Sequence, residues 1–413
     1  MTSARSRIGR RPAALTGLLA LAALAAAIPA APGSGQAAPI GTGRVWWSSV
    51  NPATPGIAGT LHAVAARSAT DAWAVGWQST GAEAFAMVQR WNGAAWKAVT
   101  TPASDAVWVQ LNGVDILPSG DAVAVGHTTA AGRTTPLIQQ YPVDGGAGRE
   151  IPGPVPAAGG AWQGIDLLSG TDGWAVGQSG SLVEGEPAQT LIARWDGTAW
   201  QQVPSPSPGT LSSRLTAVTA IAADDAWAVG QFRDATDAKV EKSLVLHWDG
   251  VAWSQVASPN PGAVRTTLLA VDAVGPGEFW AVGYTLDTVT DDPDPDDLLH
   301  PVALYSKGGA WRVLRSTKAT ATEFTGVVAV GPRDVVVSGY QLAAGNETAN
   351  IEEWNGAALT PDSIDPGTDG GDHIGSALSG LAAEPNGGRL WAVGWAANLS
   401  PLAAQPYSWR SDR

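Results

Sequence analysis

The sequence contains no cysteine. This absence excludes disulfide bonds, thiolate metal sites, cysteine nucleophiles and lipid anchors attached through cysteine. Basic residues are also scarce, since 24 Lys and Arg stand against 37 Asp and Glu, which gives a formal net charge of −13. Because an acidic surface repels a phosphate backbone, we expect no nucleic-acid partner.

Long apolar runs are nearly absent, and the one that stands out spans residues 13–27. Four arginines precede it, and small residues follow it up to Ala38. This order is typical of a secretory signal peptide. The run is shorter than the ~20 residues that a membrane-spanning helix needs. We therefore interpret residues 1–38 as a signal peptide and expect a secreted protein that does not span a membrane.

One hexapeptide pattern, DAWAVG, recurs along the remaining chain. Its copies end at Gly76, Gly126, Gly177, Gly230, Gly283, Gly339 and Gly394, with spacings of 50, 51, 53, 53, 56 and 55 residues. A constant period of this size indicates repeated supersecondary units. Each unit reads as four short strands, of which the second is the hexapeptide and the third ends near a tryptophan. Pairs such as Asn92-Gly93 and Asp196-Gly197 then predict two-residue hairpin turns before the fourth strand.

Four-stranded antiparallel units in this number predict an all-β fold, a seven-bladed β-propeller over residues 39–413. The blades are expected to start near residues 60, 110, 161, 214, 267, 323 and 377. The last unit lacks a fourth strand, and residues 39–52 resemble one, as in Trp46-Trp47-Ser48-Ser49. We therefore expect the N-terminal strand to complete the last blade and close the ring.

The DAWAVG copies and the W(D/N)GxxW turns together resemble the repeats of secreted actinobacterial β-propeller proteins, a group loosely related to kelch and galactose-oxidase-type propellers. The resemblance covers nearly the whole chain after residue 38 and implies the propeller fold. It implies little about function. The copper centre of galactose oxidase depends on a tyrosine cross-linked to cysteine, so the absence of cysteine excludes that chemistry here.

Twenty tryptophans occur, and most recur at equivalent positions of the units. We interpret the recurring ones as interblade core, including Trp409 as a third-strand end. Trp77 and Trp395 break the repeat because they directly follow the hexapeptide glycine, where a loop is expected to begin. With Trp108, Trp162 and His127 they form a predicted aromatic arc for ligand binding. Tyr284 and Tyr340 occupy the position of Trp77 in two further units.

A second ring of residues lies in the first strands, each followed by a small residue. Its members are His62, Asn112, Gln163, Thr216, Leu269, Thr325 and Ser379. This ring is expected to face a water-filled channel, which makes Asn112 and Gln163 candidate ligand contacts. His62, His127 and His373 are candidate proton carriers.

Two functions remain open at this point. The first is a secreted binding module that recognises a glycan, another small molecule or an extracellular protein through its loop-rich face. The second is a cofactor-independent lyase, hydrolase or cyclase that uses the histidines. We expect no cofactor, a monomer, and no metal site, because the acidic run 291–297 matches no calcium loop.

Overall fold

The computed structural model describes residues 47–50, 58–183, 186–287, 299–316, 322–343, 346–362, 373–385, 388–399 and 402–412. They form the all-β fold that the sequence predicts, and their only helix is the short 3₁₀ turn η1 (Ala235–Asp237). The predicted signal peptide, Trp46 and the acidic run 291–297 lie outside this part of the chain. Within it, no helix has the length and apolar character needed to cross a membrane.

The strands pair antiparallel in consecutive sets that we call units. Unit 1 contains β2 (Ala58–Ser68), β3 (Asp71–Ser79), β4 (Ala84–Trp91) and β5 (Trp96–Ala98); unit 2 contains β6 (Trp108–Ile116), β7 (Ala122–Ala130), β8 (Arg133–Tyr141) and β9 (Arg149–Glu150). Unit 3 contains β10 (Gly160–Ser169), β11 (Asp172–Gly180), β12 (Ala188–Trp195) and β13 (Trp200–Gln202); unit 4 contains β14 (Ser212–Ala222), β15 (Asp225–Arg233), β16 (Glu241–Trp248) and β17 (Trp253–Gln255).

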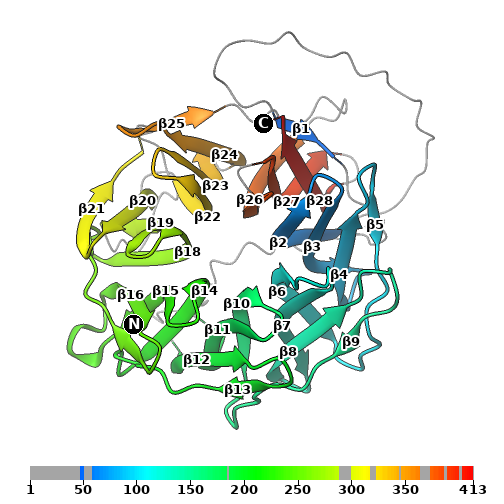
Figure 1. Ribbon diagram of the computed structural model, residues 1–413, viewed down its shortest axis with the longest axis horizontal. Coiled ribbons are helices and arrows are strands. Elements are labelled where there is room, and N and C mark those ends of the chain that lie inside the picture. The colour runs from blue at the N-terminus through cyan, green and yellow to red at the C-terminus, as the bar shows by residue number, and fades with distance from the viewer. Residues whose placement is uncertain are drawn as a thin grey trace, which may run out of the picture.

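Unit 5 contains β18 (Arg265–Gly275), β19 (Glu278–Leu286), β20 (Leu299–Lys307) and β21 (Ala310–Leu314); unit 6 contains β22 (Thr322–Gly331), β23 (Asp334–Ala343), β24 (Asn346–Trp354) and β25 (Leu359–Asp362). Unit 7 contains β26 (His373–Ala383), β27 (Leu390–Leu399) and β28 (Leu402–Ser411), and β1 (Trp47–Ser49) pairs with β28. Figure 1 shows the units arranged around a common centre, with the first strand of each unit innermost.

Every inner strand carries a β-bulge at the same point of its pairing with the second strand. The register shifts skip His62, Asn112, Gln163, Thr216, Leu269, Thr325 and Ser379, which are the members of the second ring predicted from the sequence. Four of these side chains hydrogen-bond to a carbonyl oxygen of the next unit: His62 Nδ1 to Leu111 (3.2 Å), Asn112 Nδ2 to Trp162 (2.8 Å), Thr216 Oγ1 to Leu268 (2.8 Å) and Thr325 Oγ1 to Leu378 (2.6 Å). The bulge redirects each of these four side chains, and here it directs them to the neighbouring backbone. That the ring also faces a water-filled channel stays a prediction.

The small residue after each bulge lets adjacent inner strands approach closely. A Cβ on Gly380 would lie 2.8 Å from the His62 carbonyl oxygen, and one on Gly164 would lie 3.0 Å from the Ala217 Cα. Both neighbours are backbone atoms of the adjacent unit, so they cannot give way easily. The small residues that the sequence places after the second ring therefore permit the inner strands to crowd near the centre.

Indole rings fill the spaces between units. Trp73, Trp174, Trp280 and Trp391, all in second strands, are each at most 1% exposed. Indole burial of this extent is a large apolar contribution to stability. The core interpretation of the recurring tryptophans therefore holds for these four.

Three local expectations need correction. The connection after Asn92 has four residues rather than two, because Trp91 pairs with Trp96 and the Asn92 side chain accepts the N–H groups of Ala94 and Ala95. The second strands continue three to five residues beyond the hexapeptide glycine, so Trp77 lies in β3 and not in a loop. Trp409 pairs with Ala392, which places it two residues before the end of β28; Ser411 is the residue that pairs with Trp47.

Candidate functional site

The residue after each hexapeptide glycine pairs with the residue two positions before each bulge, and we call these pairs the start ring. They are Thr60–Trp77, Gln110–His127, Ala161–Gln178, Arg214–Gln231, Thr267–Tyr284, Glu323–Tyr340 and Ala377–Trp395. The shared register places all of them at the same level, near the beginning of the inner strands. The start ring therefore gathers Trp77, Trp395, His127 and the two tyrosines that the sequence singled out.

Trp77 and Trp108 come together at this level, although they belong to different units. Their ring centroids are 5.1 Å apart with an interplanar angle of 41°, and both side chains are half-buried. Trp395 is also half-buried, and its indole lies against Gly375 of the neighbouring inner strand β26. Partly exposed indoles that already pack against protein offer a rigid apolar surface for stacking.

A hydrogen-bond chain anchors Trp108. Its Nε1 donates to Gln110 Oε1 at 3.1 Å, and Gln110 Nε2 donates to Asn112 Oδ1 at 2.8 Å. Because Asn112 Nδ2 in turn donates to the Trp162 carbonyl, the Asn112 amide has both of its ends engaged within the protein. Asn112 is therefore a positioning residue for Trp108 rather than a free ligand contact.

The predicted aromatic arc loses one member. Trp162 is completely buried and packs among Val123, Ile138 and Leu191 in the core between units 2 and 3. An indole in this position fills space between sheets and offers no surface to a ligand. Gln163, one residue later, is half-buried, and its side chain makes no hydrogen bond to the rest of the described chain.

Of the three candidate histidines, the two whose side chains are described, His62 and His127, are poorly placed for proton transfer. Burial lowers the pKa of His62, and its Nδ1 is engaged by the Leu111 carbonyl. Burial, with a smaller contribution from His62, lowers the pKa of His127 to about 4. The His127 side chain is 7% exposed, and its Nδ1 has no partner among the described residues. His373 begins β26, but its side chain lies outside the described part of the structure.

A polar cluster on units 5 and 6 was missed from the sequence. The Tyr340 hydroxyl donates to Glu323 Oε2 at 2.7 Å, and Arg265 Nη1 donates to the Tyr284 oxygen at 3.2 Å. Burial raises the pKa of Glu323 to about 7 and that of Tyr284 to about 12. Glu323 and Arg265 carry no repeat-breaking motif, so only their register beside the two tyrosines identifies them.

Three further acidic side chains lie deeper along the inner strands. Each accepts a backbone N–H of the next unit: Asp115 from Leu167 (2.6 Å), Asp166 from Ala220 (2.8 Å) and Asp272 from Ala329 (2.7 Å). Burial raises the pKa of Asp115 and of Asp272 to about 7 and that of Asp166 to about 6. Among the described residues, no group of three or more His, Asp and Glu is arranged to hold a metal ion.

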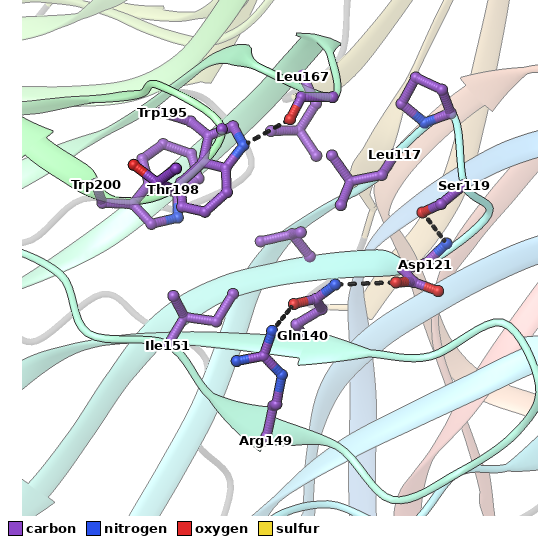
Figure 2. Close-up of a pocket in the computed structure, with 14 residues that line it drawn as sticks. Leu117, Ser119, Asp121, Gln140, Arg149, Ile151, Leu167, Trp195, Thr198 and Trp200 are labelled. Atoms are coloured by element: carbon purple, nitrogen blue, oxygen red, sulfur yellow. Dashed lines mark hydrogen bonds between the residues drawn. The ribbon is translucent and has the colours of Figure 1, made fainter.

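A separate cleft opens between units 2 and 3, close to the turns that join first to second strands. It has a volume of about 470 Å³, and Trp195, Trp200, Arg149, Gln140 and Asp121 are among its lining residues (Figure 2). This size falls within the ~300–1,000 Å³ of small-molecule sites. Both tryptophans recur in the repeat and were expected in the core; Trp200 is buried there, whereas Trp195 is half-buried. The signal that identifies the cleft is a missing tryptophan, since unit 2 has Val123 at the third position of the hexapeptide, where five of the seven units have tryptophan.

Comparison with known proteins places the chain by its fold. No protein-family model matches it, and no curated protein matches its sequence. The structure of YCF48 bound to a D1 peptide superposes with a TM-score of 0.55 at 12% identity, covering 88% of this chain and 94% of that one. An ulvan lyase of polysaccharide lyase family PL25, bound to -[GlcA(1-4)Rha3S]-, gives 0.56 at 9% identity, covering 86% and 97%. A protein of unknown function from Dyadobacter fermentans gives 0.52 at 10% identity, covering 88% and 97%.

These neighbours are β-propeller proteins, and the chain is an all-β protein of the same fold class. Identities of 9–12% carry the fold and nothing more specific. The particular function of this propeller has to be argued from its own side chains.

Proposed function

We propose that the protein is a secreted, seven-bladed β-propeller that binds an extracellular glycan at its start ring. Each of the units described above then corresponds to one blade, and β1 supplies the outer strand of the last. The observation that carries the binding proposal is the half-buried Trp77–Trp108 pair at the beginning of the inner strands.

Contacts of unit 7 with unit 1 and with the N-terminal segment support a closed ring. Trp96 Nε1 of unit 1 donates to the Ser408 hydroxyl of unit 7 at 2.9 Å, and Val50 N, just after β1, donates to the Ser408 carbonyl at 2.9 Å. The inner strands β2 and β26 also pack against each other. Without β1, the edge of β28 would be unpaired, which native β-sheet proteins avoid.

Carbohydrate is the ligand class that fits the start ring best. Flat indole faces stack on the apolar faces of sugar rings, and Trp77 with Trp108 and Trp395 supplies such surfaces. Units 5 and 6 contribute polar groups to the start ring, namely Glu323, Arg265 and the tyrosine hydroxyls. These groups suit the hydroxyl and carboxylate groups of a saccharide. The propeller neighbours bind a peptide in one case and -[GlcA(1-4)Rha3S]- in the other, so the fold accommodates either kind of ligand.

The test is calorimetric titration of the protein with a panel of neutral and uronic-acid polysaccharides. Trp77→Ala and Trp108→Ala should each weaken binding of a responding glycan about tenfold or more, because a central aromatic anchor carries a large share of affinity. Trp227→Phe is the matched control, since this half-buried indole stacks on His247 away from the start ring. Unchanged affinity in both alanine variants would contradict the proposed site.

A second candidate function is cofactor-independent catalysis on the same glycan. The Glu323–Tyr340 pair favours it, because a carboxyl group with a pKa of about 7 beside a phenol can exchange a proton near neutral pH. The histidines are less suitable, since burial keeps His62 and His127 neutral. Glu323→Gln should abolish product formation while leaving glycan affinity within about threefold; a turnover rate equal to that of the unmodified protein would reject this role.

A further inference from the structure

Two junctions, between units 3 and 4 and between units 7 and 1, contain the same group of three indoles and an arginine. Trp174 of unit 3 packs against Trp248 and Trp253 of unit 4, with centroid distances of 4.9 Å and 5.0 Å, and the Arg194 guanidinium lies 5.0 Å above the Trp174 ring. Trp391 of unit 7 repeats this arrangement with Trp91 and Trp96 of unit 1, at 5.3 Å and 5.4 Å, beneath Arg410. A second-strand indole thus fills the space in front of the next unit's tryptophan pair.

The junction between units 2 and 3 lacks two of these four groups. Val123 pairs with Gln140 in the register where Trp174 pairs with Arg194, so both the indole and the guanidinium are replaced by smaller side chains. The tryptophan pair of unit 3 is retained, with Trp195 and Trp200 at 5.6 Å. The cleft of about 470 Å³ lies between this pair and Val123.

The same replacement elsewhere is filled from within the protein. Val336 of unit 6 takes the place of the second-strand indole, yet Trp409 and Tyr407 of unit 7 pack into that junction and are 0% and 5% exposed. A valine at this position therefore does not by itself create a cleft. Between units 2 and 3, Trp195 stays half-buried, whereas Trp248 at the equivalent position of unit 4 is 6% exposed.

One edge of the cleft is formed by a carboxylate, an amide and a guanidinium that are joined by hydrogen bonds. Gln140 Nε2 donates to Asp121 Oδ2 at 3.0 Å, and Arg149 Nη2 donates to Gln140 Oε1, as Figure 2 shows. Asp121 Oδ1 is taken by the Val143 N–H at 3.0 Å, so both carboxylate oxygens have partners. Arg149 is the only cationic side chain among the lining residues, is exposed, and forms no ion pair within the described chain.

We propose that this cleft is a second binding site, distinct from the start ring, for an aromatic ring that carries a nearby carboxylate. The ring occupies the position that a second-strand indole fills in units 1, 3, 4, 5 and 7, between Trp195, Trp200 and Val123. The carboxylate pairs with Arg149, whose guanidinium fork matches carboxylate geometry. The apolar walls from Leu117, Ile151 and Leu167 exclude water from the ring.

The experiment uses indole-3-acetate as the probe, with binding followed by calorimetry and by ligand-observed NMR. The mature protein should bind it saturably, and unsubstituted indole should bind about fivefold more weakly because it lacks the charge. Val123→Trp should abolish binding by placing a protein indole in the cleft. Arg149→Gln should reduce affinity to that of indole. The matched control is Arg133→Gln, because Arg133 is exposed and its guanidinium donates to the Pro156 carbonyl.

The outcomes separate clearly. Arg149 is exposed, so its substitution tests the charge contact even if Val123→Trp fails to fold. Binding that persists in a folded Val123→Trp protein, or that is unaffected by Arg149→Gln, would overturn the proposal, as would no saturable binding at all. A peptide containing the sequence Gly-Trp-Glu-Gly distinguishes the two sources of the bound aromatic ring. Tighter binding of the peptide than of indole-3-acetate indicates a tryptophan of a partner protein, and weaker binding indicates a free aromatic acid.

Discussion

The Ser408 side chain connects the first and last units, so its substitution measures how much this junction contributes to stability. Its hydroxyl accepts the Trp96 indole N–H at 2.9 Å and donates to the Val50 carbonyl of the segment following β1, and the residue is completely buried. Ser408→Ala leaves the Trp96 N–H unpaired in the core, which costs about 1–3 kcal/mol, and removes a second bond worth about 1 kcal/mol. We therefore expect the free energy of unfolding to fall by about 2–4 kcal/mol.

The measurement is urea unfolding followed by tryptophan fluorescence and circular dichroism. Ser48→Ala is the matched control, because this exposed hydroxyl on β1 contacts the Arg410 carbonyl at 3.3 Å and its loss should cost less than about 0.5 kcal/mol. A double-mutant cycle with Trp96→Phe isolates the indole contact and should give a coupling energy of about 1 kcal/mol. Equal stability of Ser408→Ala and Ser48→Ala, with no coupling to Trp96, would refute the argument that this junction is held by Ser408.

Three further predictions concern the fold. Burial raises the pKa of Asp272 from 3.8 to about 7, so the folded state binds this proton more tightly and loses stability as the pH rises from about 4 to about 7. The free energy of unfolding of Asp272→Asn, relative to that of the unmodified protein, should therefore be higher at pH 8 than at pH 5. Urea unfolding measures this difference, and a difference that does not depend on pH would contradict the prediction. Gly380→Ala should destabilise by about 1–3 kcal/mol, because its Cβ would meet the His62 carbonyl oxygen at 2.8 Å, whereas Gly331→Ala, with no atom within 4 Å, should change the melting temperature little. Trp174→Val should cost about 3–5 kcal/mol and open a cleft like that beside Val123, and a crystal structure with a filled junction would disprove the second part.

The sequence was sufficient for the fold class because its repeats are local. DAWAVG copies, each with an apolar segment before it and a tryptophan near the end of the strand after it, specify short antiparallel strands and their core indoles without any long-range information. The Asn92-Gly93 pair likewise marks a turn, since Gly93 adopts φ +92°. The length of that turn was missed, because an Asn side chain that caps two N–H groups favours four residues over two.

The candidate site was harder to predict because its contacts cross between units. The sequence identified Trp77 and Trp108 as exceptions to the repeat, and the structure brings them into contact. It gave no indication that His62 and Asn112 are bulge residues bonded to the next unit, because a bulge is a property of pairing rather than of composition. Trp162 also breaks the repeat, yet it is core, since it packs against side chains from the neighbouring unit.

The pairing of β1 with β28 has a consequence for how the chain is made. Val50 and Ser408 are 358 residues apart in sequence, so β1 is synthesised long before its pairing partner β28. During that interval β28 does not exist, and a chain interrupted before residue 402 would retain the exposed edge that β28 otherwise pairs. Unpaired strand edges are where aggregation and proteolysis begin. Protection of this edge therefore requires synthesis to have passed β28, because a chain that contains β28 can cover the edge and a chain interrupted before it cannot.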